Sequence, residues 1–282
     1  MTTPLFTIIF GPTASGKTEL AYTLAETQGA DILSFDSRHV YREMSIVTGK
    51  DLPPPNAPFQ VFGLNLVNPD EEFSIRHYYE YAKQIIEEHR QARKPLILVG
   101  GSWQYASVII SPPPSLLAVK NYEQRQELET ASLEELQQLA QDKNPERWQS
   151  MNSSDQANPR RLIRLLEYTD PVEEALPALL QKDEYTLEIL NPDIEVLEQR
   201  IRARIDKRLE QGALEETKLL MDKYPNWKMP SFSSTGYGYL RQHLEGTISL
   251  EEAKKLWWFQ ERKYAKRQKT WIKKIQATQQ VV

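Results

Sequence analysis

Residues 11–18 read GPTASGKT and directly follow the apolar run LFTIIF. A glycine, four residues and then Gly-Lys-Thr is the pattern of a phosphate-binding loop when it joins a buried strand to a helix. The backbone N–H groups and the helix N-terminus form an anion cradle, Lys17 neutralises the outer phosphate, and Thr18 can hold Mg²⁺. The residues predicted to bind a diphosphate or nucleotide are therefore Gly11, Pro12, Thr13, Ala14, Ser15, Gly16, Lys17 and Thr18.

Apolar runs alternate with helical periodicity in the first part of the chain, which is typical of a parallel sheet flanked by helices. The expected strands are Leu5–Phe10, Asp31–Phe35, Phe59–Leu66, Pro95–Val99 and Tyr185–Leu190. A helix is expected over Thr18–Gln28, and a longer one begins at an N-cap, Ser74, and ends near Arg93. Functional residues in such a fold follow the carboxyl ends of the strands, here in the segments GPTASGKT, DSRH and GGS.

The segment SPPPS at 111–115 interrupts this pattern and indicates a domain boundary. We expect an α/β core at 1–112, a helical insertion at 113–170, and core completion with basic C-terminal helices at 171–282. The predicted fold class is α/β: a P-loop parallel sheet flanked by helices, with a helical insertion domain and a helical C-terminal segment. Trp257, Trp258 and Trp271 are expected in the core of that last segment.

The composition argues against several classes of protein. The 282 residues include no cysteine and only four histidines, without metal-motif spacing, which disfavours disulfide frameworks and thiolate metal sites. No run approaches the roughly 18–20 apolar residues of a membrane span, and the N-terminus lacks the basic region of a secretory signal. We therefore expect a cytoplasmic protein that binds no membrane, with a monomer as the default state.

Charge is unevenly distributed although the net charge is −4. Between Arg262 and Lys274 there are seven basic residues and no acidic one, and a second basic cluster lies at 200–208. A chain that is acidic on average can therefore still present a basic face to a nucleic acid.

A P-loop kinase should also carry an aspartate at the end of an apolar strand to hold Mg²⁺. The segment LILVGGS at 96–102 ends in glycines and serine instead. Asp36 follows ILSF, but it precedes the reactive and basic run Ser-Arg-His-Val-Tyr-Arg rather than a typical metal-holding sequence. A nucleotide kinase is disfavoured, and a nucleic-acid-binding NTP switch without transfer chemistry stays open, with Asp36 beside Ser37 weighing against it.

Several further segments share one order along the chain. They are GPTASGKT, FDSRHVYREMSIVTGKD, VNPDEEFS, LVGGSWQYAS, NPRRLIRLLEY, STGYGYL and YAKRQKTW, from residue 11 to residue 271. Together they resemble the tRNA dimethylallyltransferases, also called tRNA isopentenyltransferases; the P-loop is widely shared, whereas DSxxVYR and AKRQxTW are much more specific. The resemblance implies transfer of a dimethylallyl group from its diphosphate to the exocyclic N6 amine of the adenosine 3′ of the tRNA anticodon, with release of pyrophosphate.

The resemblance also implies roles for individual residues. Asp36 would take the proton of the amine, Ser102, where the family has threonine, would place a hydroxyl near the bridging oxygen, and Arg204 would cap the diphosphate. The implied catalytic residues are thus Asp36, Ser102, Lys17 and Arg204. The implied tRNA-binding residues are Asp36, Ser37, Arg38, His39 (glutamine in the family), Ser102, Arg160, Arg161, Arg164, Lys266 and Arg267. The resemblance likewise implies that the insertion at 113–170 binds tRNA.

Read without the resemblance, several of these residues have ordinary explanations. Arg204 also fits an amphipathic helix beside an apolar stripe, and the arginines at 160–164 fit a solvated helix face. An adenylate isopentenyltransferase, which prenylates a free nucleotide, is the main alternative. The basic run at 262–274 favours a polynucleotide acceptor, so the expected partners are tRNA and dimethylallyl diphosphate, and the expected cofactor is Mg²⁺.

Overall fold

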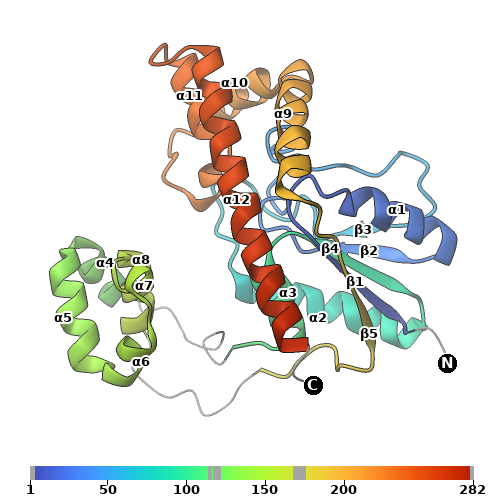
Figure 1. The fold of residues 1–282 in the computed structure, drawn as a ribbon, viewed down its shortest axis with the longest axis horizontal. Helices are drawn as coiled ribbons and strands as arrows, with labels where there is room; N and C mark the ends of the chain where they lie inside the picture. Colours follow the sequence, from blue (N-terminus) through green and yellow to red (C-terminus); the bar gives the residue numbers. More distant parts are fainter. Residues whose placement is uncertain (1–3, 114–115, 117–121, 168–175, 280–282) are drawn as a thin grey trace. The chain divides into compact units, whose positions relative to one another are not determined.

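A computed structural model describes residues 4–113, 116, 122–167 and 176–279 of the chain (Figure 1). Its centre is a five-stranded parallel sheet with the strand order β3-β2-β4-β1-β5. The strands are β1 (Phe6–Phe10), β2 (Asp31–Ser34), β3 (Val61–Phe62), β4 (Leu96–Gly100) and β5 (Tyr185–Ile189). The predicted α/β fold class is confirmed, and each strand lies within or at the edge of an apolar run that predicts it.

The third strand is much shorter than the predicted span Phe59–Leu66, since only Val61–Phe62 pair with β2. Gly63 follows with a φ of 82°, and a Cβ atom there would fall 2.5 Å from the carbonyl oxygen of Ser34. The chain therefore turns away from the sheet at a position that only glycine tolerates.

Helices cover both faces of the sheet. Figure 1 shows α1 (Lys17–Gln28) on one side and α2 (Ile75–Ala92) with α3 (Trp103–Ile110) on the other. Ala21 and Ala25 of α1 are fully buried against apolar side chains of the inner strands. Ser74 caps α2 as predicted, because its hydroxyl accepts the His77 N–H while the His77 ring accepts the Ser74 N–H.

A second group of helices follows β5 and packs around Trp257. These elements are α9 (Ile194–Glu210), α10 (Ala213–Lys223), the 3₁₀ helix η2 (Pro230–Ser233), α11 (Tyr237–Leu244) and α12 (Leu250–Gln279). Trp257 is fully buried and Trp258 partly buried, as expected, but the expectation for Trp271 is wrong. Trp271 is 40% exposed because its neighbour Ile272 takes the buried side of α12.

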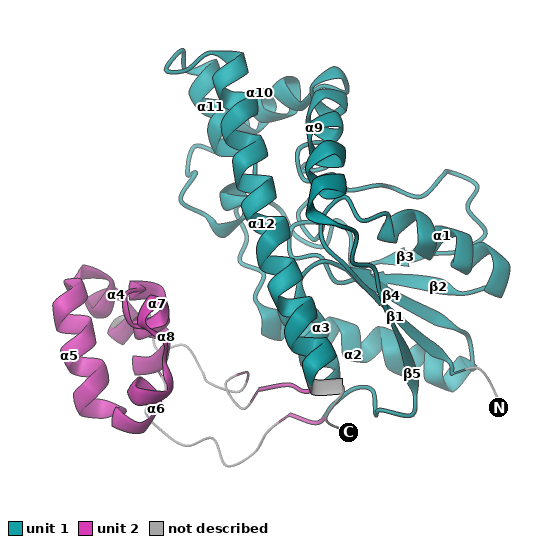
Figure 2. Cartoon of the chain, viewed as in Figure 1, with its two compact units in different colours: residues 1–110, 178–282 teal, residues 111–177 magenta. Residues whose placement is uncertain are grey.

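The chain divides into two compact units (Figure 2). Residues 1–110 and 178–282 form the first unit, and residues 111–177 form the second. The expected boundary after residue 170 falls in 168–175, outside the described residues. The second unit contains α4 (Tyr122–Thr130), α5 (Leu133–Lys143), α6 (Pro145–Ser150), α7 (Ser153–Gln156) and α8 (Pro159–Leu166). Its own small core includes Leu136, Ala140 and Leu162, so the insertion buries apolar surface by itself.

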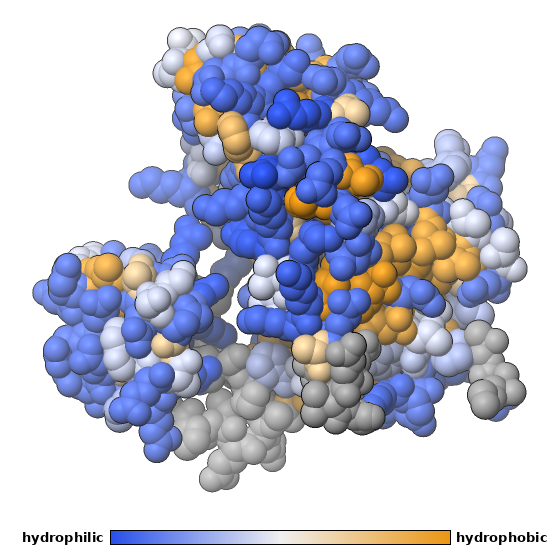
Figure 3. Space-filling model, in the orientation of Figure 1, coloured by the Kyte–Doolittle hydropathy of each residue, from blue (hydrophilic) through white to orange (hydrophobic). Residues whose placement is uncertain are grey.

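The surface is mixed in character. On the face drawn in Figure 3, hydrophilic residues cover most of α12, and an apolar patch lies beside its C-terminal half. Within the described part of the chain, no helix is long and apolar enough to cross a membrane.

One partly buried contact fixes the segment between β2 and β3. The Glu216 carboxylate of α10 accepts the backbone N–H groups of Ser45, Ile46 and Val47 at 2.7–3.0 Å, and the Tyr237 hydroxyl at 2.7 Å. An anionic acceptor for three consecutive N–H groups holds this turn against the second group of helices.

Glu216→Ala is expected to lower the free energy of unfolding by about 2–4 kcal/mol, because three backbone donors and a tyrosine hydroxyl lose a charged acceptor. Urea denaturation measures the change. Glu215→Ala is the matched control, since Glu215 lies in the same first turn of α10 and is exposed. Equal effects of the two substitutions would show that the carboxylate does not hold the turn.

Candidate active site

A cavity of about 850 Å³ lies at the carboxyl edge of the sheet. It is lined by the loop after β1, the segment after β2, the end of β4, and side chains of α9 and α12. The strand register explains this gathering, because Phe10 pairs with Gly100 and Ser34 with Val99. The three strands end level with one another, so the residues that follow them share one space.

Residues 11–16 form the predicted loop between β1 and α1. Ala14 and Gly16 have φ values of 60° and 91°, which place both in the left-handed region. A Cβ atom on Gly11 would fall 2.8 Å from Ser15 Oγ, and this buried hydroxyl has no hydrogen-bond partner in the described structure. The first N–H groups of α1 lack intrahelical acceptors. An unpartnered hydroxyl beside a helix N-terminus fits a bound phosphate.

Lys17 is held inside the cavity by the loop itself. Its Nζ donates to the carbonyl oxygen of Pro12 at 3.1 Å. Burial lowers the pKa of Lys17 to about 8, although Asp36 counteracts this shift. Without a bound anion, the ammonium form of Lys17 is therefore only slightly favoured over the neutral amine at neutral pH, and a bound phosphate would stabilise the charged form.

Thr18 lines the same cavity, which also contains carboxylates. Mg²⁺ in phosphate sites takes one or two protein oxygens together with substrate phosphates, and this donor set suits it. The described residues contain no cluster of three or more His, Cys, Asp or Glu side chains that could hold a metal by themselves.

Asp36 follows β2 and faces the cavity. Its Oδ1 accepts the Arg38 N–H at 2.9 Å, which fixes the side chain in a tight turn. Burial acts to raise the pKa of Asp36, but His39, the Arg38 N–H and Lys17 outweigh it and hold that pKa below its usual range. The carboxylate is therefore ionised at neutral pH and free of a proton.

Ser102 contacts Ser37, the residue that follows Asp36. The Ser37 N–H donates to Ser102 Oγ at 3.4 Å, and Ser102 Oγ lies 3.4 Å from Ser37 Oγ. Tyr264 of α12 lines the cavity, and burial raises the pKa of this phenol to about 12. Tyr264 thus stays protonated and keeps a hydrogen-bond donor beside the cavity.

Two arginines of α9 contact the phosphate loop. Arg200 donates to the Ala14 carbonyl oxygen at 3.3 Å, and Arg204 donates to Thr13 Oγ1 at 3.1 Å. Burial, followed by the nearby Arg208, lowers the pKa of Arg204 to about 10. The structure therefore brings Arg204 to the loop, where the sequence resemblance implies it.

Gly49 leaves room for the guanidinium groups of Arg204 and Arg208. Its φ is 65°, and a Cβ atom there would overlap the guanidinium groups of Arg204 and Arg208. The glycine of the segment VTGKD therefore serves the packing of two buried cations.

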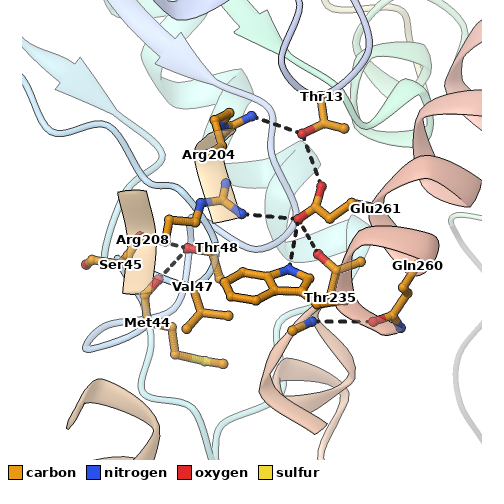
Figure 4. Close-up of polar contacts among 12 residues, drawn as sticks. Thr13, Met44, Ser45, Val47, Thr48, Arg204, Arg208, Thr235, Gln260 and Glu261 are labelled. Carbon is orange, nitrogen blue, oxygen red and sulfur yellow. Dashed lines mark hydrogen bonds and ion pairs between the residues drawn. The ribbon is translucent and has the colours of Figure 1, made fainter. Parts of the chain in front are cut away.

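Sequence reasoning missed two residues on α12 that contact the loop. Glu261 accepts hydrogen bonds from Arg208 at 3.2 Å, Thr235 at 2.8 Å and Thr13 Oγ1 at 3.3 Å (Figure 4). Gln268 accepts the Thr13 N–H and donates to the Gly101 carbonyl oxygen, both at 2.8 Å. The sequence feature that could have identified them is their spacing. They lie four and eleven residues after the buried Trp257, which places both on the inner face of the helix.

The residues implied to contact tRNA are spread over both units. In the first unit, Arg38 donates to the Pro230 carbonyl oxygen at 2.6 Å and to Ser233 Oγ at 3.2 Å. Burial lowers the pKa of His39, although Asp36 opposes this shift. Arg267 lines the cavity, whereas Lys266 is exposed on α12.

The remaining three arginines lie on α8 of the second unit. Arg160 is exposed, Arg161 pairs with Asp155, and Arg164 pairs with Glu167 at 3.1 Å. Glu167 is buried, so its bond to Arg164 also supports the fold of the insertion.

Comparison with known proteins agrees with these features. The family model described as IPP transferase matches residues 39–275. The tRNA dimethylallyltransferase of Herpetosiphon aurantiacus is 32% identical over 280 residues, which cover 96% of this chain and 88% of that protein.

This chain belongs to the IPP transferase family. Solved structures share its fold. The tRNA isopentenylpyrophosphate transferase of Bacillus halodurans matches with a TM-score of 0.66 and 28% identity over 95% of this chain and 86% of that one. A eukaryotic dimethylallyltransferase acting on tRNA matches with a TM-score of 0.79 and 23% identity, over 95% of this chain and 69% of that one.

Binding of pyrophosphate by this IPP transferase is expected to weaken above about pH 8. The pKa of Lys17 is lowered to about 8, so its ammonium charge is present below that pH and is lost as the pH rises through it. One required proton reduces affinity by up to about tenfold for each pH unit above the pKa. Calorimetric titration from pH 7 to 9.5 checks this.

The control is Lys17→Met, because the ionisation of pyrophosphate itself affects both proteins alike. The wild-type protein should bind pyrophosphate more tightly than this variant at pH 7, and this difference in affinity should shrink as the pH rises. An advantage that stays constant across the range would contradict the role given to Lys17.

Proposed function

We propose that this protein transfers a dimethylallyl group from dimethylallyl diphosphate to the exocyclic N6 amine of the adenosine 3′ of the anticodon in tRNA, releasing pyrophosphate. One observation carries the proposal: an ionised carboxylate, Asp36, lines the same cavity as an anion-binding loop. Membership of the IPP transferase family, with relatives named tRNA dimethylallyltransferase, supports it.

The donor diphosphate occupies the loop in this proposal. Breaking the bond between the allylic carbon and the bridging oxygen leaves the electron pair on pyrophosphate, where negative charge develops. Lys17 and Arg204, both desolvated in the cavity, stabilise that charge together with the loop N–H groups. Ser102, whose hydroxyl lies 3.4 Å from that of Ser37, is assigned to donate a hydrogen bond to the leaving oxygen.

Mg²⁺ is the proposed cofactor, and Thr18 is the residue that would hold it at the loop. When bound, it would neutralise part of the charge on the leaving pyrophosphate.

The acceptor amine reacts on the Asp36 side of the cavity. The nitrogen lone pair forms the new bond to the allylic carbon, and the amine proton moves to a carboxylate oxygen of Asp36. That proton becomes strongly acidic as the new bond forms, so a carboxylate with a low pKa is a sufficient base. The adenosine must leave its base stack to reach this position.

Basic residues outside the cavity are proposed to bind the rest of the tRNA. Arg267 at the cavity and Lys266 on the exposed side of α12 suit phosphate contacts, which position an RNA without reading its sequence. Arg160, Arg161 and Arg164 of the insertion are proposed as a second contact. A tRNA substrate is consistent with a cytoplasmic protein, and we propose that it acts as a monomer.

The test is incubation with dimethylallyl diphosphate, Mg²⁺ and unmodified tRNA, followed by mass analysis of the nucleosides. Dimethylallyl adenosine from the tRNA is expected, and adenosine monophosphate is added as a competing acceptor. Preferential prenylation of the free nucleotide, or ATP hydrolysis without transfer, would overturn the proposal.

Asp36→Asn is expected to reduce the rate of transfer by about 10²–10⁴-fold, because the proton acceptor is lost. Pyrophosphate binding should remain within a few-fold of the wild-type value, since the asparagine still accepts the Arg38 N–H. Glu19→Gln is the matched control, because Glu19 is a carboxylate that lines the same cavity. Single-turnover rates near the wild-type value in Asp36→Asn would remove Asp36 as the base.

A further inference from the structure

Trp271 is an exposed aromatic side chain in the most basic part of the chain. All six tryptophans lie in the described residues, and Trp271 is the only one of them that is exposed, at 40%. A tryptophan at the surface offers a large, flat and rigid face to a ligand. The position of this face on the helix indicates which ligand it suits.

Trp271 continues a row of residues on α12 that begins inside the cavity. Tyr264 and Arg267 line the cavity, and Trp271 follows Arg267 after one helical turn, about 6 Å along the axis. Spacings of three and four residues place these three side chains and Lys274 on one face of the helix. The row therefore leads from the cavity, past the exposed Arg267, to Trp271.

The row repeats one arrangement, an aromatic ring followed three residues later by a cation. The Arg267 guanidinium carbon lies 5.6 Å from the centroid of the Tyr264 ring, and Lys274 Nζ lies 5.0 Å from the centroid of the Trp271 ring. Both distances fit cation–π contacts, which keep a positive charge beside each ring. Aromatic faces combined with cations are the means by which proteins bind unpaired nucleotides, because the base stacks on the ring and the cation attracts the phosphate.

The charge around Trp271 favours an anionic ligand. Residues 262–279 contain no acidic side chain. Lys269 donates to neighbouring residues of the protein itself at 2.6 Å, whereas Lys266 and Lys273 are exposed. An aromatic ring within a positively charged surface suits an RNA better than it suits an apolar protein surface.

We propose that Trp271 stacks on an unpaired base of the tRNA anticodon loop, next to the target adenosine, while Arg267 contacts the adjoining phosphate. This inference rests on the proposed function, because it takes the acceptor to be a tRNA whose adenosine enters the cavity. An adenosine that leaves the loop deprives its neighbours of a stacking partner, and unpaired loop bases can turn outward onto an aromatic side chain. Trp271, about 10 Å along the axis from Tyr264, is placed to supply that partner outside the cavity.

The first test measures the affinity of the full-length wild-type protein and three variants for unmodified tRNA by filter binding. Trp271→Ala should weaken binding by about tenfold, because one base loses its stacking partner. Trp271→Phe should stay within about threefold of wild type, whereas Trp271→Leu, which is apolar but has no aromatic face, should resemble Trp271→Ala. Pyrophosphate binding should be unchanged in all three variants.

Phe259→Ala is the matched control, because Phe259 is 46% exposed on the same helix and does not line the cavity. It should leave tRNA binding unchanged. Salt dependence separates stacking from phosphate contact: Trp271→Ala should keep the wild-type slope of log affinity against log salt concentration, and Arg267→Ala should reduce that slope by about one.

The second test identifies the base with anticodon stem-loop RNAs that carry one abasic nucleotide beside the target adenosine. At one position, the abasic change should weaken binding to wild-type protein by about tenfold. The same change should have little effect on binding to Trp271→Ala, because the protein and RNA changes remove one and the same contact.

Wild-type tRNA affinity in a folded Trp271→Ala protein would overturn the inference, as would additive effects at every loop position. A molar mass that rises with protein concentration in wild-type protein, but not in Trp271→Ala, would assign the ring to a contact between copies and also overturn it. If a thermal melt shows that Trp271→Ala does not fold, the comparison of Trp271→Phe with Trp271→Leu decides. Absence of tRNA binding by wild-type protein would count against the proposed function itself, and the inference would fall with it.

Discussion

Strands β1, β2 and β4 end at the same level of the sheet, and the site depends on this constraint. Because these parallel strands pair in register from Phe6↔Leu96 to Phe10↔Gly100, the phosphate loop, Asp36 and the Gly100-Gly101 turn begin at one edge of the sheet. A shift of a single residue would turn the buried side chains of a strand to the opposite face. The apolar core of the sheet therefore fixes the position of the polar residues that follow it.

Helix α12 adds a second constraint from the other end of the chain. Gln268 joins Thr13 to Gly101, and Glu261 joins the same threonine to Arg208 and Thr235. A buried carboxylate is costly unless it is paired, and here the Arg208 ion pair offsets that cost. The shape of the loop thus depends on residues about 250 positions away in sequence.

Burial in the cavity disfavours the charged forms of Lys17 and Arg204. Burial lowers the pKa of Lys17 to about 8 and that of Arg204 to about 10. An anionic ligand relieves both penalties, so the same desolvation that weakens the empty site strengthens binding of a diphosphate. Asp36 keeps its negative charge in this field, which suits a group that must accept a proton.

The sequence by itself determined the strands, the phosphate loop and the cap of α2, because these follow from local apolar periodicity and from residue types that only certain turns accept. The motif resemblance also singled out Asp36 and Arg204, which the structure brings to one cavity. Only the tertiary structure decided that the basic helix α12 presents Glu261 and Gln268 to Thr13, since the spacing from Trp257 places both on the inner face but does not show which segment that face contacts. It also decided that Gly63 ends β3 and that Trp271 is exposed, because both depend on contacts between segments far apart in the chain.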